Sequence, residues 1–434
     1  MSSAGVREAA EAAKRASRSL ASLEETKRNR VLEAMASALE KSVVELFTAN
    51  QLDIQNATVR GADEALPASM LARLKLTEGK LREMVEQVRS VAALSDPLNR
   101  KLDAIELDKG LNLEKISVPL GVLAVIFEAR PDAVTQIASL AIKSGNAVIL
   151  KPGREVEQTA KAIVSSLRNA LVSEGVHEDA ISLVPGREGV SELLAMPDLI
   201  DMVIPRGSKS LVEYVQANTR IPVLGHSEGI CHIYVDRAAD QELSLRVIED
   251  AKLDYAAACN AVETVLVHRD IALEFLPKLL TRLRERGVII HGDEQVCRLN
   301  SEVQPVAAWH CEYGEPEIAV GVVNSIYAAI EHIHKHGSAH TESILTEDTS
   351  AAEKFLLEVD AAGVFHNAST RFADGFRYGF GAEVGISTSK LHARGPVGLE
   401  GLTTYKYVLR GHGQLAGDYR GANARAFTHR REDR

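Results

Sequence analysis

The chain has 434 residues, of which 45% are hydrophobic and 25% charged, which is typical of a globular enzyme and excludes collagen-like, coiled-coil and largely disordered chains. Its 50 Lys and Arg residues stand against 60 Asp and Glu residues, for a formal net charge of -10. Proteins that bind nucleic acid or membrane surfaces usually show the opposite balance. No window approaches the roughly 18 apolar residues of a transmembrane helix. We therefore expect neither kind of partner, and an anionic ligand would need a few well-placed cations or helix ends.

Cysteine usage and the N-terminal segment indicate a cellular location. The four cysteines, Cys231, Cys259, Cys297 and Cys311, show no CxxC motif and no disulfide-framework spacing, which favours a reducing compartment. Residues 1–30 are rich in Ala, Ser and Arg, as a transit peptide is, but they contain four glutamates, and transit peptides are poor in acids. We interpret the segment as an amphipathic helix and expect a cytoplasmic protein.

Hydrophobic spacing predicts helices over the first hundred residues, for example through Val31, Met35 and Leu39 at i, i+4 steps. Apolar alternation across residues 105–118, interrupted by Asp108-Lys109-Gly110, predicts a β-hairpin.

From residue 121 the sequence alternates between strand-like and helix-like segments. We expect five strands before residue 225, in VLAVIF, AVILK, ISLVPG, LIDMVI and IPVLG. A second alternating stretch begins at CHIYVD and includes AVETVLVH. Strands alternating with helices of this length predict two α/β domains with parallel sheets. The last seventy residues become Gly-rich and contain the alternating strand LTTYKYVLRG.

No GxGxxG or GxxxxGK[ST] motif follows any predicted strand, so a dinucleotide would have to bind in another way. Two loops at strand ends are candidates. Lys151-Pro152-Gly153 follows AVILK, and Pro205-Arg206-Gly207-Ser208 precedes a helix, where free backbone N–H groups favour a phosphate. By spacing alone, both loops are more often simple turns.

Cysteine and histidine offer two further candidates. Cys259 lies between a helix and a β-branched strand, a position that can present sulfur to a cleft, although most such cysteines are packing residues. In EHIHKHGSAH, His332 and His336 stand at i, i+4, which is a possible metal-ligand spacing. Gly337 ends that helix, and no carboxylate or cysteine completes a ligand set. We therefore favour a solvated helix end and expect no metal site.

Several segments together resemble gamma-glutamyl phosphate reductase (glutamate-5-semialdehyde dehydrogenase), a branch of the aldehyde dehydrogenase superfamily. They run in the family's order and are VPLGVLAVIFEARPDAV, SGNAVILKPGREV, PRGSKSLVEYV, CHIYVD, ACNAVETVLV, HTESILTED, FHNASTRFADGF and GAEVGISTSKLHARGPVGLEGLTTYKYVLRGHGQ. The resemblance implies reduction of L-glutamyl 5-phosphate by NADPH to L-glutamate 5-semialdehyde and phosphate, the second step of proline biosynthesis.

The resemblance also implies roles for residues. The cysteine of the CNxxET motif, Cys259, is the nucleophile that forms a thioester. The lysine of the KP motif, Lys151, contacts the adenosine ribose, and Gly207 and Ser208 lie near the pyrophosphate. A glutamate that holds the nicotinamide ribose falls on Glu312, in a segment that departs from the family pattern by having Gly321 where a Lys is frequent.

Two differences from the hydrolytic aldehyde dehydrogenases, at Arg130 and in the LELGGK motif, bear on the substrate and on the reaction. Arg130 stands where those enzymes carry an oxyanion-hole asparagine and suits a phosphate-bearing substrate, unless it pairs with Glu128 or Asp132. Asn260 is a candidate oxyanion donor beside Cys259. The LELGGK motif with its water-activating glutamate is absent, with Glu228 as a possible replacement. The alternative interpretation of the sequence is an NAD-dependent aldehyde dehydrogenase that hydrolyses its thioester.

The resemblance implies an aldehyde-dehydrogenase-like α/β fold with two parallel-sheet domains and a small β oligomerisation extension. We expect an NADPH-binding domain over 1–103 and 118–230, a catalytic domain over 231–395 and an extension with tail over 104–117 and 396–434. In the extension, the hairpin would pair with LTTYKYVLRG. A homo-oligomer is the implied assembly, and the pathway's glutamate 5-kinase is a candidate partner.

Overall fold

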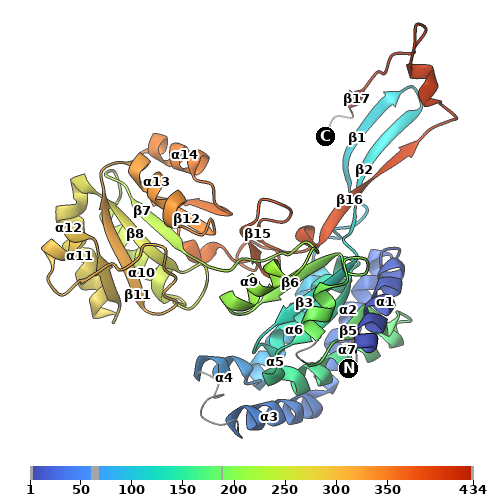
Figure 1. Ribbon diagram of the computed structural model, residues 1–434, viewed down its shortest axis with the longest axis horizontal. Helices are drawn as coiled ribbons and strands as arrows, with labels where there is room; N and C mark the ends of the chain where they lie inside the picture. Colours follow the sequence, from blue (N-terminus) through green and yellow to red (C-terminus); the bar gives the residue numbers. More distant parts are fainter. Residues whose placement is uncertain (1–2, 60–67, 187–188, 432–434) are drawn as a thin grey trace. The chain divides into compact units, whose positions relative to one another are not determined.

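The computed structural model describes residues 3–59, 68–186 and 189–431 (Figure 1). The chain forms two compact units. The first unit comprises Met1–Leu224, Phe380–Val384 and Val397–Arg434, and the second comprises Gly225–Gly379 and Gly385–Pro396. Within the described residues, no helix is long and apolar enough to cross a membrane.

The first hundred residues are helical, as predicted. Thr77 caps one of these helices by accepting a hydrogen bond from the Lys80 amide at 3.2 Å. The helices of the first unit are α1 (Ser3–Leu20), α2 (Glu25–Lys41), α3 (Val43–Val59), α4 (Ala68–Leu74), α5 (Glu78–Ala93), α6 (Pro131–Lys143), α7 (Glu157–Ser173), α8 (Gly189–Leu194) and α9 (Lys209–Ala217).

A four-stranded parallel sheet lies in the first unit, in the order β5-β4-β3-β6. Its strands are β3 (Val122–Phe127), β4 (Ala147–Pro152), β5 (Ile181–Leu183) and β6 (Met202–Arg206). Every residue of β3 and β4 is buried, as the continuous apolar runs predict. The predicted strand IPVLG forms only an isolated bridge, between Val203 and Val223. Pro222 has no N–H to donate, which limits the ladder there.

The order of these strands reverses beside β3, since β4 lies on one side of it and β6 on the other. In open parallel sheets, ligands bind at the carboxyl ends of the strands at such a reversal. Arg130 and Ser208 lie in the loops that follow β3 and β6, and Lys151 lies near the carboxyl end of β4, so all three are at this edge.

The extension is a four-stranded antiparallel sheet with the order β16-β2-β1-β17 (Figure 1). Its strands are β1 (Lys101–Asp108), β2 (Leu111–Pro119), β16 (Thr403–Arg410) and β17 (Arg430–Arg431). The predicted hairpin and its pairing with LTTYKYVLRG are therefore confirmed, with Tyr405 opposite Ser117 and Leu409 opposite Leu113.

The second unit contains a seven-stranded parallel sheet with the order β10-β9-β11-β8-β7-β12-β13. Its strands are β7 (Cys231–Val235), β8 (Val262–His268), β9 (Ile289–Gly292), β10 (Gln304–Pro305), β11 (Glu317–Val323), β12 (Thr341–Leu345) and β13 (Gly363–His366). A short antiparallel pair, β14 (Ile386–Ser387) and β15 (Gly395–Pro396), belongs to the same unit. Short 3-10 turns elsewhere in the chain span Arg154–Val156, Glu178–Ala180, Thr370–Phe372, Glu400–Leu402 and Ala416–Tyr419.

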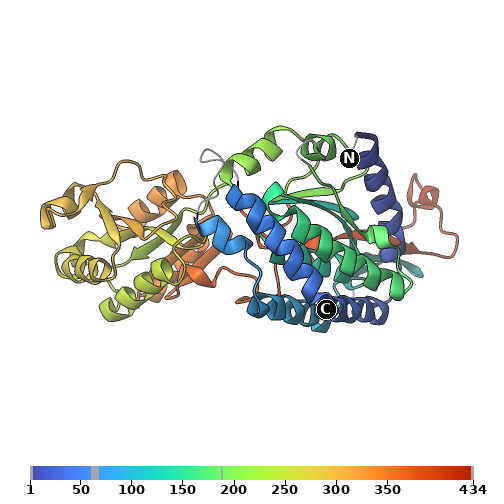
Figure 2. The same ribbon diagram turned by 90° about the horizontal axis from the view of Figure 1, so that it is seen from below.

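Helices cover both faces of this sheet, as Figure 2 shows. Val265 faces a core formed with α10 (Gln241–Leu253), α11 (Arg269–Glu285) and α12 (Glu294–Leu299). Its neighbour Leu266 faces the opposite core, with α13 (Ile326–His336) and α14 (Thr349–Glu358). Neighbouring residues of this strand thus serve two apolar layers, so the run of residues 265–267 is apolar without alternation.

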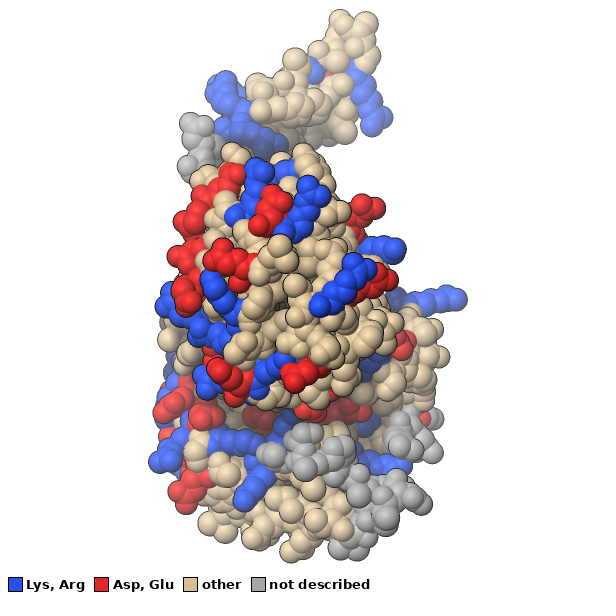
Figure 3. Space-filling view, turned by 90° about the vertical axis from the view of Figure 1, so that its left-hand side faces the viewer, with Lys and Arg blue, Asp and Glu red and all other residues tan. Residues whose placement is uncertain are grey.

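Surface charge is mixed in sign. On the face shown in Figure 3, Lys and Arg side chains are interspersed with Asp and Glu side chains. In the second unit, for example, Glu249 bridges Arg282 and Arg286 at 2.5 and 2.6 Å. On the described part of this face, Figure 3 shows no broad patch of a single charge sign.

Candidate active site

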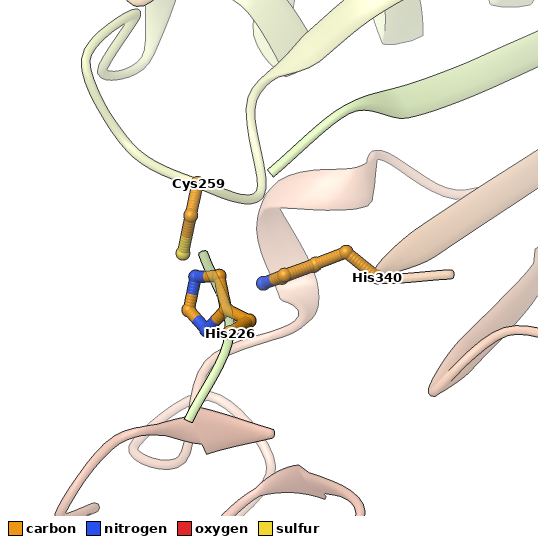
Figure 4. A group of neighbouring side chains, drawn as sticks. All are labelled: His226, Cys259 and His340. Carbon is orange, nitrogen blue, oxygen red and sulfur yellow. The ribbon is translucent and has the colours of Figure 1, made fainter. Parts of the chain in front are cut away.

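Cys259 and two histidines meet at the amino ends of three adjacent strands of the second unit. Cys259 lies in the loop before β8, His340 immediately precedes β12, and His226 lies in the segment that leads to β7. Since β8, β7 and β12 are parallel neighbours, their amino ends lie at the same edge of the sheet. Figure 4 shows the three side chains converging.

The side chains are close enough to share a proton or a ligand. One donor atom from each of Cys259, His226 and His340 lies within 4.8 Å of the others. The two imidazole rings stand edge to face, with centroids 4.9 Å apart. His226 Nδ1 lies 2.8 Å from the carbonyl oxygen of Ile386, which can only accept a hydrogen bond. Nδ1 therefore carries the proton of the neutral ring, and Nε2 carries the lone pair.

His340 is fully buried beneath this edge. Its Nδ1 lies 2.9 Å from Thr341 Oγ1 and 3.7 Å from Cys231 Sγ. Its Nε2 has no hydrogen-bonding partner among the described residues. Burial raises the pKa of the Cys231 thiol well above its usual value, so this second thiol stays protonated and is unsuited to nucleophilic attack.

Close backbone packing holds the Cys259 loop in place. A Cβ atom at Gly229 would lie 2.0 Å from the carbonyl oxygen of Cys259 and 2.5 Å from its Cα. Because the side chain is attached to this Cα, a shift of the Cα displaces the sulfur. Only glycine permits this approach between the two loops.

We therefore expect Gly229→Ala to lower kcat by about 100-fold, because a displacement of about 1 Å at a reacting group has an effect of that size. Steady-state kinetics of the folded variant measure it. Gly417→Ala is the matched control, since a Cβ there would meet nothing within 4 Å. Wild-type kcat in Gly229→Ala would show that the loop position does not matter.

The residue after the cysteine, Asn260, is buried and bonded to another loop. Its side-chain nitrogen donates to the carbonyl oxygen of Ala373 at 2.9 Å, and its oxygen accepts from the Arg371 guanidinium. Arg371 is also paired with Asp254 at 3.0 Å. These contacts favour a positioning role for Asn260, and its role as an oxyanion donor stays a prediction.

The glutamate of the CNxxET motif forms a fully buried ion pair. Glu263 Oε2 lies 2.8 Å from Lys252 Nζ, and neither side chain is exposed. Burial raises the pKa of Glu263 to about 7 despite the adjacent ammonium. The same carboxylate accepts a hydrogen bond from the Tyr313 amide at 3.4 Å, next to the exposed Glu312. The pair thus connects the strand after Cys259 to the loop of the predicted ribose ligand.

Two histidines of α13, His332 and His336, are less exposed than the sequence analysis predicted, since it expected a solvated helix end there. The half-buried ring of His332 packs against Trp309, with centroids 4.8 Å apart, and against His336 at 4.6 Å. Burial lowers the pKa of His332 to about 3, so its ring is neutral. The His332 ring also packs against the ring of His232 in β7, with centroids 5.5 Å apart. His232 Nδ1 in turn lies 3.1 Å from Glu342 Oε2.

Glu228, the possible hydrolytic base, is partnered by another side chain. Its Oε2 lies 3.0 Å from His310 Nε2, and His310 Nδ1 lies 2.9 Å from the carbonyl oxygen of His336. The pairing of Glu228 with His310 cannot be predicted from the sequence around Glu228, because the two residues are 82 positions apart in the chain.

In the first unit, Lys151 is the penultimate residue of β4 and its side chain is buried. Its Nζ donates to the carbonyl oxygen of Pro152 at 2.6 Å, which is its only hydrogen bond within the described residues. Burial lowers the pKa of the ammonium from its ordinary value. An ammonium group has three N–H donors, so the remaining donors suit the hydroxyl groups of a ribose.

The turn before α9 already holds an anionic group. The Ser208 amide donates to Glu128 Oε2 at 2.9 Å. A Cβ at Gly207 would lie 2.4 Å from the same oxygen, so glycine lets the carboxylate approach. This is the anion position expected at a helix N-terminus. A pyrophosphate near Gly207 and Ser208 would share or displace the Glu128 carboxylate, and its binding there stays a prediction.

Arg130 precedes α6 at the carboxyl end of β3. Its guanidinium has no ion pair or hydrogen bond within the part of the chain that the structure describes. Glu128 is directed to Ser208 instead, so the alternative pairing of Arg130 with Glu128 is not formed. An unpaired, half-buried guanidinium suits a phosphate ligand.

Sequence reasoning identified Cys259 but did not join it to His226 or His340. The GHSEG segment and the last histidine of EHIHKHGSAH are far from Cys259 in the chain. The sequence predicts a strand after His226, in CHIYVD, but it does not predict which strands lie side by side in the sheet.

Comparison with known proteins agrees with this architecture. Residues 1–299 match the aldehyde dehydrogenase family. A gamma-glutamyl phosphate reductase from Cyanothece sp. is 52% identical over 428 residues, covering 98% of this chain and 97% of the relative. A Synechococcus sp. gamma-glutamyl phosphate reductase is 51% identical, covering 96% of this chain and 95% of the relative.

Solved structures agree as well. The crystal structure of gamma-glutamyl phosphate reductase from Thermotoga maritima is 38% identical, with a TM-score of 0.92, and covers 94% of this chain and 99% of that one. An acetylating aldehyde dehydrogenase from Geobacillus thermoglucosidasius shares the fold at 17% identity and a TM-score of 0.67, covering 95% of this chain and 98% of that one. The chain is therefore an oxidoreductase and belongs to the gamma-glutamyl phosphate reductases of the aldehyde dehydrogenase family.

Proposed function

We propose that the chain reduces L-glutamyl 5-phosphate to L-glutamate 5-semialdehyde and phosphate with NADPH, through a thioester on Cys259, as the second step of proline biosynthesis. The observation that carries the proposal is the approach of Cys259 and the imidazoles of His226 and His340 within 4.8 Å. A nucleophile beside a base whose tautomer is fixed by a third group is the arrangement that covalent catalysis requires.

The chain's residues account for each proton and bond. His226 Nε2 takes the thiol proton of Cys259, since Nδ1 donates to Ile386. The thiolate attacks the acyl phosphate carbonyl, the C–O bond to phosphate breaks, and a thioester forms. The imidazolium returns its proton to the departing phosphate. Backbone N–H groups beside Cys259 are suited to stabilise the oxyanion, and one such donor typically contributes about 3–4 kcal/mol.

Aldehyde dehydrogenases use a nicotinamide cofactor, which supplies the hydride that reduces the thioester carbon. We propose NADPH as that cofactor. Lys151 would hold the adenosine ribose, Gly207 and Ser208 would lie near the pyrophosphate, and Glu312 would hold the nicotinamide ribose. The support is the spare hydrogen-bonding capacity of the buried Lys151 ammonium. When the reduced adduct collapses to the aldehyde, Cys259 leaves as a thiolate, and one proton taken up from solvent restores the Cys259 thiol for another turnover.

Arg130 is proposed to bind the substrate phosphate through its planar, bidentate fork. We expect Arg130→Ala to raise KM for phosphate, measured in the reverse direction, by about 10- to 100-fold, as loss of a charged hydrogen bond of about 1.5–3 kcal/mol implies. Arg154→Ala is the control, since Arg154 is an exposed arginine in the loop after β4. A KM for phosphate unchanged in Arg130→Ala would remove this residue from the phosphate site.

Assembly is also proposed by analogy with the family. Strand β16 forms the outer edge of the extension and exposes Tyr405, Tyr407 and Leu409 at 47%, 61% and 55%. These alternate residues share one face of the strand. Because an exposed, apolar edge strand invites pairing with another strand, we propose a homo-oligomer. Glutamate 5-kinase, which makes the substrate, is the proposed pathway partner.

The reverse reaction tests the proposed activity. The purified chain is given L-glutamate 5-semialdehyde and NADP⁺, with and without inorganic phosphate, and NADPH is followed by absorbance. We expect steady turnover only with phosphate, and a higher kcat/KM with NADP⁺ than with NAD⁺. Sustained turnover without phosphate would instead identify a hydrolytic aldehyde dehydrogenase.

A further inference from the structure

His226, Cys259 and His340 form a donor set that suits a metal ion as well as a proton. One thiol and two imidazoles present their donor atoms within 4.8 Å of one another (Figure 4). Thiolate and imidazole are the ligands that Zn²⁺ prefers in proteins. We propose that these three residues bind one Zn²⁺ ion, which reversibly inhibits the enzyme by occupying its thiolate. The inhibition rests on the proposed function, whereas the binding does not.

Both histidines are already oriented as zinc ligands usually are. A ligating imidazole generally donates its other N–H to a carbonyl or similar oxygen, which fixes the tautomer. His226 Nδ1 lies 2.8 Å from the Ile386 carbonyl oxygen, and His340 Nδ1 lies 2.9 Å from Thr341 Oγ1. The carbonyl leaves Nε2 of His226 as the nitrogen with the lone pair. The Thr341 hydroxyl can accept as well as donate, so His340 can keep its proton on Nδ1 while Nε2 binds a metal.

The buried nitrogen of His340 is the second, independent sign of a ligand. His340 is fully buried, and its Nε2 has no hydrogen-bonding partner among the described residues. Buried polar atoms are nearly always satisfied, so an orphaned nitrogen next to a thiol needs an explanation. A bound cation supplies the missing partner.

The distances require only a small closure. Zn–S and Zn–N bonds of about 2.3 and 2.0–2.1 Å in a tetrahedral site place donor atoms about 3.3–3.8 Å apart. In this structure the upper limit on the distances between the three donor atoms is 4.8 Å, which exceeds the separation in a zinc site by about 1 Å. Rotation of the half-buried Cys259 side chain about χ1 can supply that movement while the two rings stay on their partners. The fourth position remains open for water or phosphate.

Cys231 is not a fourth ligand in this arrangement. Its sulfur lies 3.7 Å from Nδ1 of His340, on the side of the ring away from Nε2. Burial keeps its thiol protonated. The site therefore consists of three protein ligands and an open position, and the metal withdraws the sulfur that must attack the acyl phosphate.

Zn²⁺ alone is the probe for the test. The metal-free chain is titrated with Zn²⁺ against a chromophoric chelator, which needs no catalytic activity. We expect one Zn²⁺ per chain, with affinity reduced about 100-fold or more in Cys259→Ser and His340→Asn, since a lost ligand should cost at least as much as a lost ligand-orienting partner. Thr341→Val, which keeps all three ligands, should weaken binding about 10- to 100-fold. Cys297→Ser and His334→Ala, a remote thiol and an exposed histidine, are the controls.

A chemical readout identifies the thiol directly. Bound Zn²⁺ should slow alkylation of Cys259 by iodoacetamide at least tenfold in the wild type but not in His340→Asn, and a chelator should restore the rate. Zinc affinity unchanged by Cys259→Ser, or alkylation unchanged by bound Zn²⁺, would overturn the proposal. A chain that binds Zn²⁺ at Cys259 but lacks reductase activity would refute the proposed function alone. An active chain that binds no Zn²⁺ there would refute only this inference.

Discussion

Replacing Cys259 with alanine is expected to lower kcat by about 10⁴-fold or more, because removal of a covalent nucleophile has an effect of that order. The variant should keep its fold, since Cys259 is half-buried in a loop and is not a member of either apolar core described for the second unit. Single-turnover and steady-state assays with the purified variant measure the loss. Thermal unfolding at the wild-type temperature would show that the loss is catalytic.

Cys297→Ser is the matched control for this change. Cys297 is also a half-buried free thiol of the second unit, but its sulfur lies 3.4 Å from the carbonyl oxygen of Gly292, at the end of β9. We expect its kcat to stay within a factor of two of wild type. If Cys259→Ala kept more than about a tenth of wild-type kcat, the nucleophile would have to be another group, because covalent catalysis does not survive loss of its nucleophile.

Replacing Lys252 with methionine is expected to lower the free energy of unfolding by about 3–5 kcal/mol, the usual cost of leaving one partner of a buried ion pair uncompensated. Lys252 and Glu263 are both fully buried and lie 2.8 Å apart. Because burial already raises the pKa of Glu263 to about 7, loss of the ammonium should raise it further. Protonation removes the buried charge, so the loss of stability should be greater at about pH 8 than at about pH 5.

Urea unfolding of the purified variants at both pH values measures this effect. The double variant Lys252→Met with Glu263→Gln should recover most of the stability, since it leaves no buried charge. Arg298→Met breaks the exposed pair with Glu294, where the side chains are 74% and 88% exposed, and should change the free energy of unfolding by less than about 1 kcal/mol. Equal losses in Lys252→Met and Arg298→Met would mean that burial of the pair does not determine its contribution.

Much of the fold could be predicted from local sequence. VLAVIF and AVILK are continuous apolar runs and became β3 and β4, buried at every residue. The alternation around Asp108-Lys109-Gly110 predicted the hairpin, and the family resemblance predicted its pairing with β16. The exception was IPVLG, where composition suggested a strand but the structure has only one bridge.

The nucleophile could be predicted because it belongs to a motif. The CNxxET segment marks Cys259 by resemblance, whereas its local surroundings favoured a packing cysteine. The two histidines beside it could not be assigned in this way. Their proximity depends on β7 lying between β8 and β12, a long-range pairing that no local pattern encodes.

Hydrogen-bond partners were likewise hidden from the sequence. A short segment containing Glu128 and Arg130 offers an obvious local ion pair, yet the carboxylate is directed to the Ser208 amide, 80 residues away. The same holds for Asn260, whose partners lie in the loop of Arg371 and Ala373. Residue type identifies the polar groups that could take part in binding or catalysis. The tertiary fold decides which of these groups already have hydrogen-bond partners.

The most direct test of the central claim is the stoichiometry of NADPH formed without phosphate. The wild-type chain is mixed rapidly with L-glutamate 5-semialdehyde and NADP⁺, and the product is analysed by stopped-flow absorbance and by mass spectrometry of the intact chain. The account predicts a burst of one NADPH per active chain, a glutamyl adduct on the peptide that contains Cys259, and turnover only after phosphate is added. Continuous NADPH formation in the absence of phosphate, or turnover with phosphate but without any adduct on Cys259, would contradict it.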